Sequence, residues 1–144
     1  MGKIRVNIKL TDEESKIPYM SKPGSSGYDL FATASYTLHP GIPVLVLTGI
    51  RIAVPYGYEA QVRPRSGLAL EGVTVVNTPG TIDSSYRGEV GVILIKHGTS
   101  TYEIELGDRV AQLVFSKVEE VIFVERDELD STERNDGGFG HTGK

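Results

Sequence analysis

The sequence contains no cysteine among its 144 residues. The chain can therefore form no disulfide framework, no thiolate metal site and no thiol nucleophile, a composition that suits a reducing compartment. It also has no apolar run long enough to span a membrane, and we expect no signal peptide. We expect a soluble, intracellular protein in the cytoplasm, without a membrane partner; a nuclear or organellar share stays open.

Positive charge is scarce as well. The chain has 15 lysines and arginines against 19 acidic residues, which gives a formal net charge of -4. Non-specific nucleic-acid binding depends on many basic side chains that neutralise phosphates. We therefore expect no general nucleic-acid partner, while local basic sites stay open.

Short apolar runs separated by glycine and proline predict an all-β fold. In residues 4–10 apolar side chains alternate with polar ones, the period of a strand with one buried face. Further strands are expected within residues 44–47, 50–54, 58–62, 73–76, 90–95, 109–115 and 118–124. Short strands at this spacing are typical of a sandwich or barrel. We expect one β domain over residues 1–125 and a flexible, charged and then glycine-rich arm over residues 126–144.

Residues 80–89 place an acid, an aromatic and an arginine between two glycines, at Asp83, Tyr86 and Arg87. Glycine permits backbone angles that other residues avoid, so we expect a tight bend that presents these side chains. A carboxylate held in this way can take a proton from water. The alternative is a hairpin tip in which Asp83 bonds only its own backbone.

A second cluster, Arg63-Pro64-Arg65-Ser66-Gly67, follows an expected strand. Arginine offers a planar fork that matches phosphate oxygens, Ser66 adds a short donor, and Gly67 allows backbone N–H groups to approach a ligand. This is anion-binding chemistry, and the alternative is a surface turn with solvated arginines.

Three further polar residues have two interpretations each. Asn77 carries an amide that can read a nucleobase edge, or it caps a turn. Gln112 lies on the same strand face as Val110 and Val114, so its amide needs a partner, which is main chain or a ligand or water in a pocket. Asp29 is an acid close to Gly27 in a further short motif.

The tail, residues 134–143, contains four glycines and one phenylalanine after Arg134. Such a segment is disordered alone but can fold over a ligand, with Phe139 on a flat ring and Arg134 on phosphates. The alternative is an unstructured solubility tail. Formal matches to G-x-G-x-x-G and to a Walker A loop fail, because both motifs need a strand before them and a helix after them.

Five of these stretches, residues 26–32, 64–69, 80–89, 107–115 and 134–143, resemble in order and spacing the five motifs of the trimeric dUTPases. The resemblance implies a distorted jelly roll, a barrel-like β-clip domain, that forms a homotrimer with shared active sites. It also implies Mg²⁺-assisted water attack on the α-phosphorus of dUTP, which yields dUMP and pyrophosphate. This reaction keeps uracil out of DNA and supplies dUMP for thymidylate synthesis.

The resemblance also assigns roles to residues of this chain. Asp83 becomes the general base, Gln112 helps to hold the water, and Asp29 acts near the metal and phosphates. Mg²⁺ is then held by substrate phosphates and waters, with no direct protein ligand. Arg109 supports the site through ion pairing. Substrate contacts are implied for Arg65, Ser66, Gly67, Asn77, Gly80, Tyr86, Arg134, Phe139, Gly140, His141 and Thr142.

Within this set, Tyr86 packs on the deoxyribose, Asn77 reads uracil, Phe139 covers the base, and Arg134 binds the terminal phosphate. The tail departs from the usual pattern at Asn135, Asp136 and His141. We expect Asp136 to point away from the triphosphate while His141 or Thr142 donates instead. Two rivals stay open: a dCTP deaminase on the same fold, and a trimer that binds nucleotide without turnover.

Overall fold

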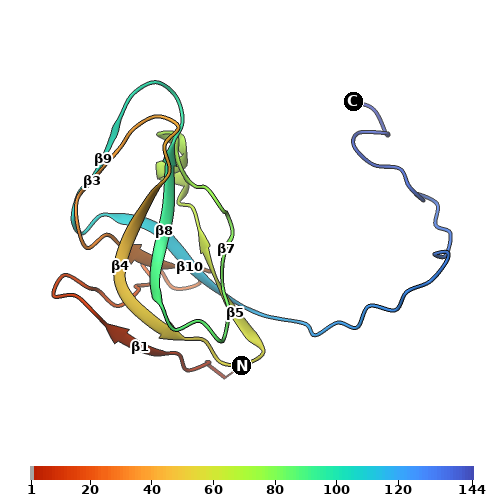
Figure 1. Ribbon diagram of the computed structural model, residues 1–144, viewed down its shortest axis with the longest axis horizontal. Coiled ribbons are helices and arrows are strands. Elements are labelled where there is room, and N and C mark those ends of the chain that lie inside the picture. Colours follow the sequence, from red (N-terminus) through yellow and green to blue (C-terminus); the bar gives the residue numbers. More distant parts are fainter. Residues whose placement is uncertain (1) are drawn as a thin grey trace.

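The structure, a computed structural model, describes residues 2–144, and its regular elements are strands apart from one short helix (Figure 1). The all-β prediction is therefore confirmed. The short helix α1 was not predicted from the sequence. In chain order the elements are β1 (Asn7–Leu10), β2 (Tyr28–Phe31), β3 (Tyr36–Leu38), β4 (Val44–Ala53), β5 (Tyr58–Arg63), α1 (Ser66–Leu70), β6 (Val73–Val75), β7 (Gly80–Ile82), β8 (Glu89–Lys96), β9 (Tyr102–Ile104) and β10 (Arg109–Lys117).

Antiparallel pairing joins the strands into two four-stranded sheets, in the orders β1-β4-β8-β6 and β2-β10-β5-β7, and a two-stranded sheet, β3-β9. Among residues 2–144 this pairing closes no barrel. Both larger sheets contribute to one core, since Val46 and Val92 from the first sheet and Val62 and Leu113 from the second are at least 96% buried. No helix in the described part of the chain is long and apolar enough to cross a membrane.

The expected strands at residues 44–47 and 50–54 form one long strand, β4. Its pairing with β8 shifts register between Leu47 and Arg51, and Gly49 between them has a positive φ of 68°. A Cβ atom on Gly49 would lie 2.1 Å from the Ser15 Oγ. The glycine therefore provides both the backbone conformation of the bulge and the space in which the N-terminal loop packs.

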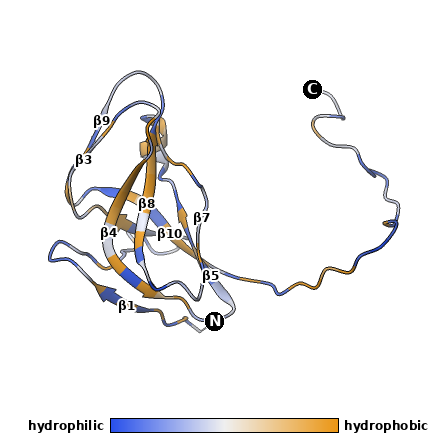
Figure 2. Ribbon diagram, in the orientation of Figure 1, coloured by the Kyte–Doolittle hydropathy of each residue, from blue (hydrophilic) through white to orange (hydrophobic). Residues whose placement is uncertain are grey.

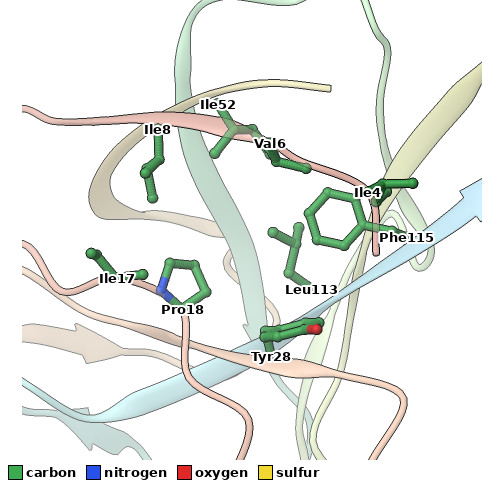
Figure 3. A pocket seen from close by; sticks show the side chains of 9 residues that line it. All are labelled: Ile4, Val6, Ile8, Ile17, Pro18, Tyr28, Ile52, Leu113 and Phe115. Carbon is green, nitrogen blue, oxygen red and sulfur yellow. The ribbon is translucent and has the colours of Figure 1, made fainter. Parts of the chain in front are cut away.

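The N-terminal strand differs from its prediction. Of the predicted strand at residues 4–10, only β1 (Asn7–Leu10) forms a regular strand. All four residues of β1 are exposed, so the predicted buried face is wrong for the single chain. Ile4, Val6 and Ile8 instead line an open apolar groove of about 220 Å³ (Figure 3). The remaining lining residues are Ile17, Pro18, Tyr28, Ile52, Leu113 and Phe115.

The predicted strand at residues 118–124 is also absent. β10 ends at Lys117, and the chain then extends away from the two sheets (Figure 1). The Val118 N–H still donates to the Gly57 carbonyl oxygen at 2.9 Å. Beyond it Ile122 and Phe123 are 90% and 94% exposed, in an apolar stretch that Figure 2 shows in orange. The apolar pattern is as predicted, but among residues 2–144 no strand pairs with this segment.

We predict that Gly49→Ala destabilises the fold more than Gly41→Ala does. Both glycines have positive φ, but a Cβ on Gly41 would meet nothing within 4 Å. Gly41→Ala should therefore cost only the left-handed backbone, about 1–2 kcal/mol. Gly49→Ala should add roughly 1–3 kcal/mol for the clash with Ser15. Urea unfolding at one protein concentration measures both, and equal losses would contradict the packing role of Gly49.

Candidate functional site

One cluster of the predicted residues lies across the β2-β10-β5-β7 sheet. The register places Asp29 on β2 opposite Gln112 on β10, and Gln112 opposite Arg63 on β5. The Asp29 carboxylate lies between two guanidinium groups, with its Oδ1 3.6 Å from the Arg65 Nε and its Oδ2 3.5 Å from the Arg109 Nη1. One carboxylate between two guanidinium groups leaves a net positive charge, which is suited to binding an anion.

The Gln112 side chain is held in one orientation. Its Nε2 donates to the Pro64 carbonyl oxygen at 3.0 Å. The partner of this amide is therefore main chain, which was one of the alternatives that the sequence left open. A Cβ atom on Gly27 would lie 2.2 Å from the Gln112 Oε1. Gly27 thus leaves the space into which the amide oxygen points, and the two motifs pack against each other.

The arginine and serine of the second motif are placed by the start of α1. Arg65 is the N-cap residue with extended backbone angles, and the Ala69 N–H donates to its carbonyl oxygen at 2.9 Å. The Arg65 Nη1 also donates to the Arg109 carbonyl oxygen at 3.1 Å. Ser66 and Gly67 are exposed in the first turn, and a Cβ on Gly67 would meet nothing within 4 Å. This turn is therefore open to a ligand.

A second cluster gathers around a cavity of about 170 Å³ whose lining includes Asn77, Gly80, Asp83 and Tyr86. The Tyr86 hydroxyl donates to the Glu89 carbonyl oxygen at 2.9 Å, and the Tyr86 N–H donates to the Asp83 carbonyl oxygen at 3.1 Å. The Asp83 side chain is exposed. The amide, the acid and the aromatic ring of the predicted site thus meet at one cavity.

The two glycines of this loop act differently from the prediction. Neither has a positive φ, and Gly80 begins β7 instead of a bend. Their contribution is space: a Cβ on Gly88 would lie 2.3 Å from the Tyr86 hydroxyl, and one on Gly80 would lie 3.3 Å from the Asn77 Nδ2. Close approach of side chains, not unusual backbone angles, explains both glycines.

Glu89 is a lining residue to which the sequence assigned no role. Its Oε1 accepts a hydrogen bond from the Thr11 hydroxyl at 3.2 Å, whereas its Oε2 is buried and finds no partner among the described residues. An acid at the start of a strand is usually solvated, so no sequence signal distinguished it.

Asp83 and Gln112 lie at opposite ends of β5, whereas Gly80 of the same cavity lies opposite Val62, next to Arg63. β7 is antiparallel to β5 with Ile82 opposite Ala60, so Asp83 follows near the level of Glu59. Gln112 lies opposite Arg63 at the other end. At roughly 3.3 Å per residue, the strand separates these levels by about 13 Å. A single chain therefore does not bring Asp83 to Gln112.

The tail forms a third group, away from both clusters (Figure 1). Its residues surround a hollow of about 470 Å³, and Phe139 is fully exposed. The lining consists of Glu133, Arg134, Gly138, Phe139, Gly140, His141 and Thr142. Across residues 2–144 no group of three or more histidine or acidic side chains is placed to hold a metal ion.

Comparison with known proteins agrees with the motifs. Residues 13–143 match the dUTPase family. The chain is 49% identical to the deoxyuridine 5'-triphosphate nucleotidohydrolase of Syntrophotalea carbinolica, with 99% of each chain covered. It is 48% identical to the Clostridium tetani protein of the same name over the full length of both.

Solved structures support the fold. The dUTPase of Staphylococcus bacteriophage 80alpha with dUPNHPP gives a TM-score of 0.89 at 24% identity and covers 99% of this chain and 100% of its own. A mutant dUTPase of S. aureus phage phi11, whose structure shows the coordination of a structural Mg(II) ion, gives a TM-score of 0.80 at 21% identity and covers 87% of this chain and 98% of its own. From the family match and the close relatives, we conclude that the chain belongs to the dUTPase family.

Proposed function

We propose that this protein hydrolyses dUTP to dUMP and pyrophosphate. The observation that carries the proposal is the cavity at which Asn77, Asp83 and Tyr86 meet, because reading a base, activating water and fitting a sugar are the tasks that this reaction requires. The names of the related nucleotidohydrolases support the same substrate. The reaction would remove dUTP before it enters DNA and supply dUMP for thymidylate synthesis. The lack of cysteine suits an intracellular location.

In this proposal Asp83 is the general base. Its exposed carboxylate takes a proton from the water that attacks the α-phosphorus. Asn77 and neighbouring main chain bind the uracil edge. Tyr86, fixed by its bond to the Glu89 carbonyl, packs on the deoxyribose where a 2′-hydroxyl would clash. The narrow cavity rejects the methyl group of thymine, so discrimination is largely steric.

The phosphates bind at the other cluster. Arg65 and Ser66 lie at the exposed start of α1, and Gln112 is oriented by Pro64 to hold the attacking water. Arg109 and Arg65 both lie against the Asp29 carboxylate, and Arg109 thereby helps to keep the Arg65 guanidinium group in place. Phosphoryl transfer depends mainly on positioning and charge neutralisation, which two arginines supply without a covalent nucleophile.

The donor set fits Mg²⁺ held by substrate. Asp29 is the carboxylate of this cluster, and it already faces two guanidinium groups. Protein sites often bind Mg²⁺ through few carboxylates, with substrate phosphates and waters as the other ligands. Asp29 would therefore lie near the ion without building a cage, and the ion would neutralise phosphate charge.

A homotrimer with shared active sites, each chain folded as a distorted jelly roll, is part of this proposal. The distance of about 13 Å between the levels of Asp83 and Gln112 supports it, because copies of the chain can bring one cluster of each kind together. Apolar surface supports it too. Leu45, Leu47 and Val76 are 40–55% exposed, and Figure 2 shows hydrophobic colour over parts of β4 and β8, between paler and hydrophilic segments. The groove of Figure 3 is a further apolar surface without a cover in one chain.

The arm, residues 126–144, completes the site as a flexible clamp. It extends far from its own two clusters, so it can reach the site of another subunit (Figure 1). Phe139 would cover the uracil ring and Arg134 would bind the terminal phosphate. Gly140, His141 and Thr142 line the same hollow as these two residues and would add N–H and side-chain donors.

The first test compares dUTP, dTTP, dCTP and UTP as substrates with Mg²⁺. We expect pyrophosphate from dUTP and at least 10²-fold less from the other three, because one steric or polar mismatch commonly has that effect. Ammonia is monitored in the dCTP sample. Its release would favour the deaminase, whereas binding of dUTP without turnover would favour a non-enzymatic trimer.

Asp83→Asn tests the general base. The amide keeps the shape of the side chain but cannot accept the proton, so kcat should fall about 10²–10⁴-fold while dUTP binding survives. Single-turnover kinetics and equilibrium binding measure the two effects separately. Near-normal turnover would remove Asp83 from the proposed role.

Deleting the chain from Ser131 onward tests the clamp. The deleted segment contributes no residue to the buried core, so the truncated protein should fold and assemble as the full chain does. Its kcat/KM for dUTP should nevertheless fall by at least roughly 10²-fold, since positioning and water exclusion are lost. Sedimentation and circular dichroism provide the control, and full activity after truncation would dismiss the clamp.

A further inference from the structure

A short turn in the tail is closed by two reciprocal hydrogen bonds, and we name residues 132–135 the tail clasp. The Thr132 N–H donates to the Asn135 Oδ1 at 2.9 Å, and the Asn135 N–H donates to the Thr132 Oγ1 at 3.0 Å. Asn135 has a φ of 47°, a left-handed conformation that asparagine tolerates better than most residues. Both bonds are local, so the clasp forms without contact to the two sheets.

Arg134 lies inside the clasp and is held by a further turn. Its Nε donates to the Gly137 carbonyl oxygen at 2.8 Å, and the Gly137 N–H donates to the Arg134 carbonyl oxygen at 3.0 Å. The bond at Nε fixes the plane of the guanidinium group. The two terminal amino groups are then the donors that can bind a phosphate in bidentate fashion. Arg134 lines the same hollow as Phe139.

The clasp has the form of a helix-capping box but does not cap a helix. Reciprocal bonds between a threonine and the residue three positions later usually begin a helix. Here Gly137 and Gly138 follow, and residues 137–144 form no helix. The bonds therefore order Arg134 and its neighbours instead of a longer element.

We propose that Thr132 and Asn135 are positioning residues for Arg134, which they hold ready for the terminal phosphate before the tail closes. This inference rests on the proposed function, in which Arg134 binds that phosphate. Ordering a free arginine side chain and its backbone on binding costs conformational entropy, and a turn formed in advance reduces that cost. The unusual Asn135 is thereby explained as a residue that both adopts the left-handed conformation and closes the clasp.

The experiment measures binding of a non-hydrolysable α,β-imido analogue of dUTP, and of dUMP, to full-length variants by calorimetry. Thr132→Val is isosteric but cannot accept the Asn135 N–H, whereas Thr132→Ser keeps the acceptor. Thr132→Val should weaken binding of the analogue roughly 3–10-fold, the effect of one neutral hydrogen bond. Thr132→Ser should bind as the parent does. Binding of dUMP, which has no terminal phosphate, should be unchanged in both.

Asn135→Gly provides an independent variant, because it keeps the left-handed backbone but removes the side-chain acceptor. It should weaken binding of the analogue to a similar extent. In an Arg134→Ala background, Thr132→Val should have no further effect, since the clasp acts through Arg134. An equal loss of dUMP binding, or an undiminished loss in that background, would show a general role in tail folding and overturn the proposal.

The possible failures are distinguishable. If Arg134→Ala weakens binding of the analogue while Thr132→Val and Asn135→Gly do not, the clasp is refuted and the phosphate role of Arg134 stands. If Arg134→Ala itself leaves binding of the analogue unchanged, the phosphate role fails and the clasp proposal falls with it.

Discussion

The pairing of β10 with both of its neighbours is the constraint on which the candidate site depends. This register sets Asp29, Gln112 and Arg63 in one row across three strands. A slip of one residue would turn Gln112 to the opposite face and remove it from Pro64 and Gly27. The close contact between Gln112 and Gly27 also leaves no space for a larger residue at position 27. The placement of Asp29 opposite Gln112 therefore depends on the register of the sheet.

The same sheet keeps Asp83 apart from Gln112. β7 runs antiparallel to β5 and carries Asp83 away from the end at which Arg65 and Gln112 lie. Strands joined by ladders of hydrogen bonds cannot slide to close such a gap without breaking many bonds at once. Under the proposed function the two clusters would be two parts of one site, and other copies of the chain would be the means of joining them. The apolar surfaces left open on a single chain agree with that need.

The sequence predicted features that depend on neighbours along the chain and missed those that depend on distant partners. The alternation at residues 58–62 and 109–115 correctly located β5 and β10. The pattern at residues 118–124 is equally apolar, but the predicted strand is absent. An apolar pattern indicates which side chains favour burial and does not show whether another strand is available for pairing. The two glycines at residues 80 and 88 predicted a tight bend with unusual backbone angles, whereas Gly80 and Gly88 are explained by side chains that approach them closely. The pairing of Asp29 with two arginines also needed the sheet order, which no local pattern contains.

The tail is ordered by local hydrogen bonds, whereas the sheets are ordered by pairing between strands that are distant in the sequence. Its internal order comes from bonds between residues three apart, such as those of Thr132 with Asn135, and these need no core. Because these bonds are local, such a segment keeps its turns when it moves away from the sheets, as the proposed clamp requires. The sheets fix the positions of Asp29, Gln112 and Arg63 through the register of their strands. In the proposed clamp, the turns of the arm would already meet part of the entropy cost of its closure.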